Sequence, residues 1–224
     1  MVDTASTISP TMLSEPQVVQ LLSPFGLALT SAQLGSLLTY LDLLLRWNQK
    51  INLTAIRTPE ECVTRHFGES LYLARWIKLE GRLLDIGSGA GFPGLALKIA
   101  FPALAVTLLE PVAKKRAFLK EVARACQMER VEVRSERLED FIRRAPTVAF
   151  DSVTVRAVGK LGRLIQGAAR LLRPGGSLCL WVSEEQAASL IGAEEWFRWE
   201  RPIPLPLSHR REILVGIRTG FQPT

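Results

Sequence analysis

Between positions 85 and 94 the chain reads Asp-Ile-Gly-Ser-Gly-Ala-Gly-Phe-Pro-Gly, with glycine at every second position from Gly87 to Gly91. Glycine has no Cβ atom, so the backbone here can turn tightly and come close to a ligand. If a helix follows, its free N–H groups face the same point. The pattern predicts a site for a nucleoside-bearing cofactor, and the plain alternative is a tight turn that holds nothing.

Two acidic residues indicate which cofactor the site takes. Asp85 precedes Gly87 by two positions, where a carboxylate would repel the pyrophosphate of a dinucleotide. S-adenosylmethionine has no phosphate and carries a sulfonium and an ammonium group, so an acid is tolerated or attractive. Glu110 lies 25 residues beyond Asp85 and offers a carboxylate that accepts both hydroxyls of a ribose. The two acids favour S-adenosylmethionine over NAD, although Asp85 could also serve only as a cap for the loop.

The segments that position these residues alternate between short apolar runs and helical patterns. Helices are predicted over 113–128 and 161–172, and a turn over 173–176. Strands are predicted at residues 82–86, 105–109, 131–135, 149–155, 177–182 and 212–217. This order predicts a doubly wound, mostly parallel sheet, with both acids where a strand ends.

The part of the chain before the first predicted strand is helical in pattern. One helix starts near Ser14 and ends at Gly26, and a second runs from Thr30-Ser31 to about Lys50. A third is expected from Pro59 through Trp76, with Val63, Phe67, Leu71 and Ala74 facing inward. We therefore expect a helical extension over residues 1–80, packed on a domain formed by residues 81–224, as a single compact unit.

Composition bounds the class of protein. The 224 residues are 47% hydrophobic with a net charge of +6, and since residues 1–45 contain three acids but no Lys or Arg, residues 46–224 carry +9. Such a charge favours nucleic acid as a partner, with an ordinary solvated surface as an even alternative. No apolar stretch approaches the roughly 20 residues of a membrane span, and no basic start precedes an apolar block. We expect a cytoplasmic protein without membrane contact. Its three cysteines have no disulfide or metal-site spacing.

The chain resembles a known bacterial family along nearly its whole length. The resemblance rests on the run at 85–94, on Asn52-Leu53-Thr54-Ala55-Ile56, and on Arg65-His66-Phe67-Gly68-Glu69-Ser70-Leu71. Further agreement comes from Glu110 followed by Lys114-Lys115-Arg116-Ala117-Phe118-Leu119, from Arg156-Ala157-Val158, and from Arg173-Pro174-Gly175-Gly176. These segments are similar to those of the GidB family (RsmG), the 16S ribosomal RNA guanine-N7 methyltransferases. The family usually has Asp where Glu69 stands, and a small polar residue where Pro111 stands.

The resemblance implies a fold, a cofactor and a substrate. The fold would be that of a class I S-adenosylmethionine methyltransferase, with a Rossmann-like sheet of seven strands and an N-terminal helical extension. The substrate would be a guanine in the helix 18 loop of 16S rRNA, free or within the small ribosomal subunit. We expect a monomer without a metal ion.

Residue by residue, the expected site combines the glycine motif with positions carried over from the family. The cofactor-binding set is Asp85, Gly87, Gly89, Phe92, Glu110, Pro111, Leu138, Glu139 and Arg156. Arg156 would lie near the reaction centre, and a structural salt bridge to Asp151 or Glu139 is its equal alternative. The candidates for RNA contact are Asn52, Arg65, His66, Lys114, Lys115 and Arg116. For Asn52 a turn-forming role, and for Arg65 and His66 a capping or packing role, are the structural alternatives.

Motifs that the sequence lacks also indicate which reaction is catalysed. The segment 151–156 has no Asn/Asp-Pro-Pro loop for methylation of an exocyclic amine, and no cysteine lies in a loop suited to carbon-5 chemistry. Guanine N7 already carries a lone pair, so methylation there needs no proton removal and no general base. Two rivals stay open: an RNA-binding protein on this fold without activity, and an NAD-dependent oxidoreductase.

Overall fold

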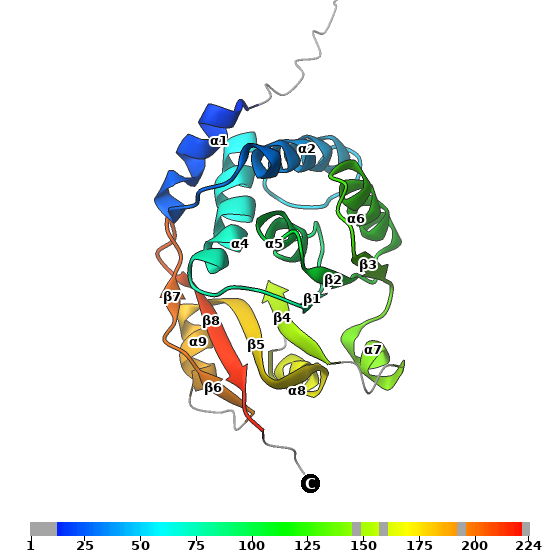
Figure 1. The fold of residues 1–224 in the computed structure, drawn as a ribbon, viewed down its shortest axis with the longest axis vertical. Helices are drawn as coiled ribbons and strands as arrows, with labels where there is room; N and C mark the ends of the chain where they lie inside the picture. Colours follow the sequence, from blue (N-terminus) through cyan, green and yellow to red (C-terminus); the bar gives the residue numbers. More distant parts are fainter. Residues whose placement is uncertain (1–12, 145–148, 157–160, 192–195, 221–224) are drawn as a thin grey trace, which may run out of the picture.

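The fold is a mostly parallel sheet covered by helices on both faces (Figure 1). The computed structural model describes residues 13–144, 149–156, 161–191 and 196–220. Ala157 and Val158, which contributed to the family resemblance, lie outside these ranges. The strands follow the order β3-β2-β1-β4-β5-β8-β6, with β7 also paired to β8. Their bounds are β1 Arg82–Ile86, β2 Ala105–Leu109, β3 Val131–Arg134, β4 Phe150–Arg156, β5 Leu172–Ser183, β6 Phe197–Trp199, β7 Ile203–Pro204 and β8 Arg211–Arg218.

The five strands β1 to β5 are parallel, and β8 is antiparallel to β5. The chain order reverses between β1 and β4, and ligands of such sheets bind at this switch point, beyond the carboxyl ends of the strands. Because β8 is antiparallel, its first residue, Arg211, lies beside the last residue of β5, Ser183. Arg211 therefore belongs to the same edge of the sheet as the ends of β1, β2 and β4.

Helices account for most of the remaining chain. Their bounds are α1 Glu15–Leu22, α2 Ser31–Asn48, α3 Pro59–Glu61, α4 Glu69–Leu71, α5 Gly94–Ala100, α6 Ala113–Ala125, α7 Leu138–Arg144, α8 Leu161–Leu171 and α9 Glu184–Ile191. A π-helical turn over Cys62–Gly68 joins α3 to α4, and short 3-10 turns cover Ser23–Phe25 and Tyr72–Arg75. The region 59–75 is thus one continuous helical segment, as its apolar spacing predicted, with a widened turn in its middle.

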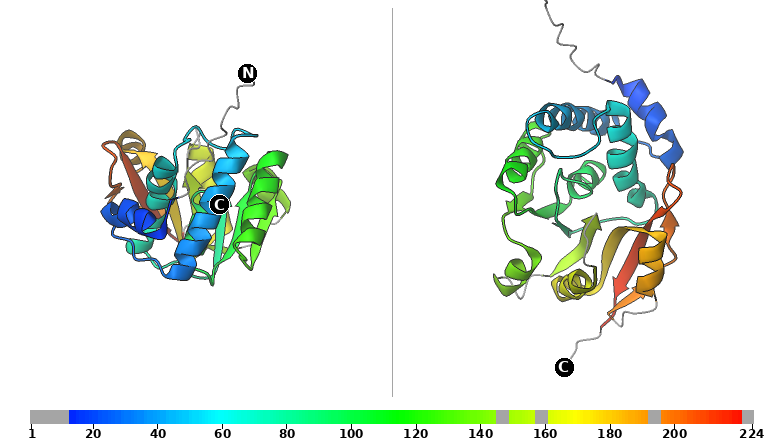
Figure 2. Two further views of the ribbon diagram at one scale, coloured as in Figure 1. Left: turned by 90° about the horizontal axis from the view of Figure 1, so that it is seen from above. Right: turned by 180° about the vertical axis from the view of Figure 1, so that it is seen from behind.

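Two hydrophobic clusters lie on opposite faces of the sheet, since successive side chains of a strand alternate between faces. Leu83 and Leu108 face a cluster that also contains residues of α1, α2, α5 and α6. Leu84 and Leu109 face a second cluster formed with α7, α8 and α9. Figures 1 and 2 show these two groups of helices on opposite sides of the sheet.

Helix α5 is enclosed between the sheet and the outer helices. Residues Gly94 to Ile99 are all buried, including Lys98, whose ammonium group donates to the carbonyl oxygens of Pro102 and Leu104. Helix α2 begins at a capping box between Thr30 and Gln33, and Gln33 Nε2 also donates to the carbonyl oxygen of Ile99 at 3.0 Å. The N-terminal helices therefore form a further layer, held to the sheet through α5.

The predicted strands are confirmed to within one or two residues at most ends, and the doubly wound architecture is confirmed. One prediction was wrong: residues 173–176 do not form a separate turn, because β5 already begins at Leu172. Gly175 has a positive φ of 76° there, and the register against β4 shifts between Phe150 and Ser152, so the strand starts with an irregular stretch. Four further elements, α7, α9, β6 and β7, were not predicted from the sequence.

Candidate cofactor site

The glycine cluster forms a loop between β1 and α5 at the carboxyl edge of the sheet. Gly87, Gly89 and Gly91 have φ values of 71°, 57° and 86°, in the left-handed region that side chains disfavour. The amides of Gly87 and Ser88 donate to the carbonyl oxygen of Leu109, at 2.9 and 3.1 Å, and so attach the loop to the end of β2. The glycines are required by the backbone conformation of this loop.

Asp85 lies directly beneath the loop and is completely buried. Its Oδ1 accepts a hydrogen bond from Thr154 Oγ1 at 2.8 Å, while Oδ2 lies near the Gly94 amide without a hydrogen bond of normal geometry. Burial raises the pKa of Asp85 to about 6, although hydrogen bonds to its carboxylate oppose the shift. A buried carboxylate with a free oxygen is suited to a cationic ligand group.

Glu110 follows β2 and faces the same loop. Its Oε2 accepts from the amide of Gly89 at 2.9 Å, and its Oε1 accepts from the amide of Val112 at 2.8 Å. Each carboxylate oxygen has a second lone pair, which leaves one acceptor position on each for a ribose hydroxyl. The loop and the carboxylate therefore hold each other in place before any ligand arrives.

These residues fit S-adenosylmethionine and do not fit a dinucleotide. Asp85 and Glu110 put two buried carboxylates around the loop, where a pyrophosphate would meet like charge. The unpartnered Asp85 oxygen suits an ammonium or sulfonium group, and Glu110 suits a diol. The donor set is thus that of a nucleoside with a positive charge and no phosphate.

Arg156, at the end of β4, belongs to a buried ionic cluster next to this site. Its guanidinium donates to Glu69 Oε2 at 2.8 Å and to the carbonyl oxygen of Arg65 at 2.6 Å. Arg211 forms a two-point contact with the same carboxylate, at 2.9 and 2.6 Å. Trp181 Nε1 donates to the carbonyl oxygen of Glu69 at 2.8 Å. One carboxylate therefore holds two guanidinium groups at the carboxyl edge of the sheet.

The salt-bridge partners considered for Arg156 in the sequence analysis were wrong. Asp151 instead accepts a hydrogen bond from the Arg82 amide and forms an ion pair with Arg173. These two arginines lie at the starts of β1 and β5, beside the start of β4. Glu139 is exposed on α7. Asp151 is the second and Arg156 the last of the seven residues of β4, so the two lie toward opposite edges of the sheet.

His66 and Phe92 pack against each other between the helical layer and the glycine loop. Their rings stack at 4.8 Å, and Phe92 also stacks on Tyr40 at 5.1 Å, which leaves Phe92 only 7% exposed. His66 Nε2 lies 2.8 Å from Thr54 Oγ1. Burial, with Arg156, Arg65 and Arg211 nearby, lowers the pKa of His66 to about 3. Phe92 is thus fixed beside the loop by its two ring contacts, and His66 is neutral at physiological pH.

Tyr40 links the helical layer to the loop itself. Its buried hydroxyl donates to the carbonyl oxygen of Ala90, between two of the three glycines. A Cβ atom on Gly91 would lie 2.3 Å from that hydroxyl. No sequence pattern marks Tyr40 as a site residue, because it lies within the apolar run of α2 like its neighbours.

The candidates for RNA contact occupy different settings. Asn52 is exposed in the loop after α2, and Arg65 is exposed on the π-helical turn. Lys114 is exposed at the start of α6 and Lys115 is partly exposed. Arg116 instead folds back, since its guanidinium donates to the carbonyl oxygens of Glu110 and Pro111 at 3.1 and 2.5 Å. Arg116 thus supports the Glu110 turn and His66 is packed against Phe92, while Asn52, Arg65 and Lys114 remain exposed.

Three further predicted site residues have contrasting surroundings. Pro111 is exposed directly after Glu110, so this departure from the family pattern disturbs no packing. Leu138 is 8% exposed at the start of α7, close to Gly167 of α8, where an added Cβ would approach it to 2.8 Å. Glu139 beside it is exposed. The assignment of Leu138 and Glu139 to the cofactor-binding set stays a prediction.

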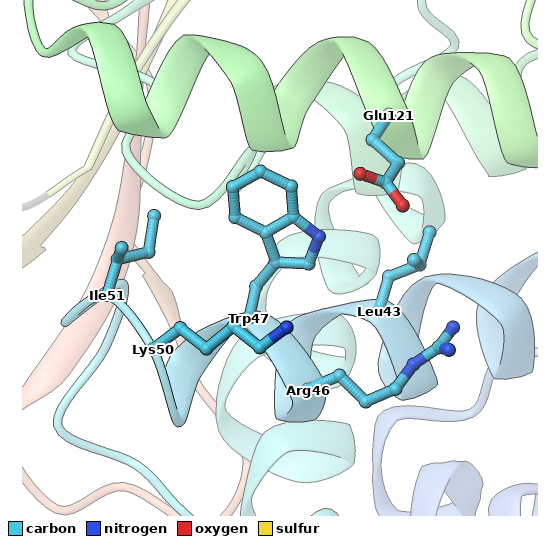
Figure 3. A pocket seen from close by; sticks show the side chains of 6 residues that line it. All are labelled: Leu43, Arg46, Trp47, Lys50, Ile51 and Glu121. Carbon is cyan, nitrogen blue, oxygen red and sulfur yellow. The ribbon is translucent and has the colours of Figure 1, made fainter.

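A separate groove of about 400 Å³ lies between α2 and α6. Figure 3 shows Trp47 in its centre, with Arg46 and Lys50 on the α2 side and Glu121 on α6. The Trp47 ring packs on Phe118 at 5.7 Å. The groove contains none of the predicted cofactor residues and is distinct from the site around the glycine loop. Of the helices described, none has the length and apolar character of a membrane span.

Solved structures with a similar fold identify the class. A putative O-methyltransferase from Klebsiella pneumoniae aligns with a TM-score of 0.58 and 17% identity, covering 81% of this chain and 90% of that one. A ribosomal protein L11 methylase from Lactobacillus delbrueckii subsp. bulgaricus aligns with a TM-score of 0.57 and 15% identity, covering 69% and 79%. The fold is that of the class I S-adenosylmethionine-dependent methyltransferases.

Sequence comparison identifies the family within this class. A family model described as GidB, rRNA small subunit methyltransferase G, matches residues 33–201. Proteins named ribosomal RNA small subunit methyltransferase G are similar: one from Chloroflexus aggregans is 43% identical over 167 residues, covering 74% of this chain and 70% of its own. One from Xanthomonas axonopodis pv. citri is 39% identical over 198 residues, covering 86% and 90%. The chain belongs to the GidB family of rRNA small subunit methyltransferases.

Proposed function

We propose that this protein transfers a methyl group from S-adenosylmethionine to N7 of a guanine in the helix 18 loop of 16S rRNA. One observation carries the proposal: in a chain of the GidB family, two buried carboxylates, Asp85 and Glu110, face a glycine loop suited to a cationic nucleoside. The substrate is the rRNA itself or the small ribosomal subunit. We also propose that the protein acts as a monomer in the cytoplasm, where that substrate is found.

In this proposal the residues of the site have separate tasks. Glu110 accepts the ribose hydroxyls, Asp85 attracts the positive end of the cofactor, and Gly87 and Gly89 allow the backbone to approach it. We further propose that Phe92 and Leu138 border the pocket and that Pro111 and Glu139 lie at its rim. Arg156 is held by Glu69 close enough to Asp85 to interact with its charge, which favours a place beside the reacting atoms.

The transfer needs no residue to remove a proton. When bound, S-adenosylmethionine supplies a methyl group, which bonds to guanine N7 as the bond to sulfur breaks and its electron pair returns to sulfur. The N7 lone pair is free in neutral guanine, so orientation supplies the acceleration. His66, with a pKa of about 3, is too weak a base to be poised for proton transfer near neutral pH. The protein's task is to align the base and exclude water.

We propose that the helical extension over residues 1–80 works as part of this unit, not as a separate domain. Its side chains share one hydrophobic cluster with α5, α6 and the sheet, and Tyr40 contacts the glycine loop. Asn52, Arg65, Lys114 and Lys115 are the accessible positions that we propose contact RNA.

The test measures methyl transfer and cofactor binding separately. Small ribosomal subunits that lack the modification are incubated with tritiated S-adenosylmethionine, and the modified base is then mapped. Glu110→Gln is expected to weaken cofactor binding about tenfold or more, because an amide group replaces a carboxylate oxygen that accepts a backbone N–H.

Glu121→Gln, in the separate groove between α2 and α6, is the matched control and is expected to bind normally. Binding of the cofactor without transfer to RNA would favour the rival, an RNA-binding protein on this fold. Binding of NADH in place of S-adenosylmethionine would overturn the proposal altogether.

A further inference from the structure

Leu207 is exposed at the tip of the loop between β7 and β8. It is 67% exposed, although it is a large apolar residue. Its φ is 58°, and among the residues described here it is the only apolar side chain with a positive φ. A leucine in the left-handed region is disfavoured, and such conformations cluster at functional positions. Neither burial nor backbone preference explains a leucine here.

Hydrogen bonds fix the loop in this shape. The Leu205 amide donates to the carbonyl oxygen of Arg211 at 3.0 Å, and the Ser208 amide donates to that of Leu205 at 3.3 Å. The Arg211 guanidinium, which Glu69 holds, also donates to Ser208 Oγ at 3.3 Å. Leu207 is therefore presented by a defined turn next to the ionic cluster.

The position of the loop relates Leu207 to the acceptor side of the site. Arg211 lies beside Ser183 at the carboxyl end of β5, so the loop extends beyond that edge of the sheet. The same edge carries the glycine loop after β1 and Arg156 at the end of β4. Arg210, three residues after Leu207, is exposed and adds positive charge suited to phosphate groups.

The chemistry of the proposed reaction requires access to N7 of the base. In an RNA helix that atom lies in a deep, narrow groove that side chains do not enter. In-line transfer requires the reacting atoms within about 3.5 Å of each other. Proteins that act on a base extrude it from the stack, and proteins that unstack bases insert apolar side chains such as leucine.

We propose that Leu207 is a wedge that enters the base stack of the RNA beside the target guanine and holds that base toward the methyl group. The inference rests on the proposed function and adds a positioning residue to it. It accounts for an exposed apolar side chain, an unfavourable backbone conformation and a basic flank at one place.

The test compares substitutions that separate the side chain from the backbone. Leu207→Asn keeps a residue that tolerates a positive φ but removes the apolar group, whereas Leu207→Met keeps the apolar character. Ile191→Asn is the control, since Ile191 is also an exposed apolar residue, 46% exposed, at the far end of α9. Each variant is assayed for thermal unfolding, affinity for S-adenosylmethionine, and methyl transfer over a range of small-subunit concentrations, with the single-turnover rate taken at saturation.

The expected result is specific to the transfer step. Leu207→Asn should unfold at or above the wild-type temperature and bind the cofactor normally, yet transfer methyl groups about tenfold more slowly or worse. Leu207→Met should stay within about threefold of the wild type, and Ile191→Asn should be unchanged.

Other results would overturn the wedge. Wild-type transfer by Leu207→Asn would do so, as would an equal loss in Leu207→Met, which would indicate loop shape alone. A raised KM for subunits with an unchanged single-turnover rate would make Leu207 a docking contact to RNA or to a ribosomal protein. A wild-type protein that binds the cofactor but never transfers a methyl group would refute the proposed function, and the wedge with it.

Discussion

Asp85, Glu110 and Glu69 are all buried carboxylates, and their neighbours give each a different task. Glu110 accepts backbone amides and so shapes the loop, whereas Glu69 is neutralised by two arginines. Asp85 has neither a backbone amide donor of normal geometry nor an arginine partner, and its carboxylate accepts a hydrogen bond from the Thr154 hydroxyl. At the scale of single residues, the site therefore contains one carboxylate whose charge is left for a ligand.

The isolation of Asp85 leads to a prediction about pH. Its pKa in the folded protein, about 6, lies above the value of 3.8 for a free side chain, so folding favours the protonated form. That advantage is complete below about pH 4 and is lost as pH rises through 6, which costs on the order of 3 kcal/mol at pH 8. Asp85→Asn is therefore expected to match or exceed wild-type stability at pH 8 while binding S-adenosylmethionine at least tenfold more weakly.

Calorimetry of unfolding and of cofactor binding, both repeated at pH 5 and pH 8, checks this. Wild-type affinity should fall as the pH drops below about 6, since Asp85 then becomes neutral, and the affinity of Asp85→Asn should vary less. A variant that binds the cofactor as tightly as the wild type at pH 8 would contradict the assigned task.

Glu69 gives a prediction of the opposite sign for stability. Removing its charge leaves Arg156, 14% exposed, without a counter-ion beside the partly exposed Arg211, and breaking a buried ion pair costs about 3–5 kcal/mol. Glu69→Gln should lower the unfolding temperature by roughly 10 °C. Glu69→Asp, which restores the usual residue of the family, should lose less.

Glu132→Gln is the control, because Glu132 forms an ion pair with Arg134 while its side chain stays 59% exposed. Such an exposed pair contributes about 1 kcal/mol or less. If Glu69→Gln unfolds at the same temperature as Glu132→Gln, the two arginines are not held by Glu69 in solution.

The sequence indicates the residues around the glycine loop but not the partners of Arg156. The glycines, Asp85 and Glu110 lie close to the ends of strands, so periodicity places them at one edge of the sheet. The pairing of Glu69 with Arg156 and Arg211 spans 87 and 142 residues. No local pattern specifies such a contact, because it depends on how a helical segment docks on the finished sheet.

At the scale of elements, α2 and the glycine loop behave as one piece. The Tyr40 hydroxyl bonds to Ala90, and its ring packs on Phe92 and Phe67. Gly91 leaves the space that this contact needs, with a φ of 86°. The loop is therefore shaped from both sides, by β2 through Leu109 and by α2 through Tyr40.

Gly91→Ala is expected to destabilise the protein by at least about 2 kcal/mol and to abolish measurable cofactor binding. The added Cβ would lie 2.3 Å from Tyr40 Oη and 2.9 Å from Leu95 Cδ1, at a φ that alanine disfavours. Gly35→Ala is the matched control: nothing lies within 4 Å of its added Cβ, and it lies within α2. It should stabilise the protein by roughly 0.5–1 kcal/mol. Equal unfolding temperatures for the two variants would contradict the packing.

The long elements could be predicted from sequence and the short ones could not. Helix α2 has 18 residues and a capping box, and the central strands are apolar runs that end at polar or glycine residues. Strands β6 and β7 have three and two residues and include Arg198 and Pro204, so no alternation is visible. They are extended because each pairs with β8 along the edge that β5 leaves free.

At the scale of the whole molecule, positive charge is absent from the first 45 residues and concentrated in the rest. Lys114 and Lys115 lie at the start of α6, beside the Glu110 turn, where a basic side chain opposes the helix dipole and gains little from its own helix. Their placement at the carboxyl edge suits a polyanion that approaches the cofactor.

Replacing Lys114 and Lys115 together with alanine should raise the KM for small ribosomal subunits severalfold without changing affinity for S-adenosylmethionine. The dependence of log K on log salt concentration should become shallower by roughly 1 to 2, since each lost phosphate contact removes about one released ion. Lys78→Ala is the control, because Lys78 is 81% exposed before β1, at the opposite edge of the sheet. An unchanged salt dependence would remove both lysines from the proposed RNA surface.

The contact between Tyr40 and Ala90 has a consequence for genetics. Since helix α2 shapes the loop from outside, missense alleles that abolish the enzyme need not cluster around the bound molecules. They should also appear at buried positions of α2 such as Tyr40, which has no exposed surface. The positions of inactivating substitutions would then include residues that support the pocket from outside as well as residues that line it.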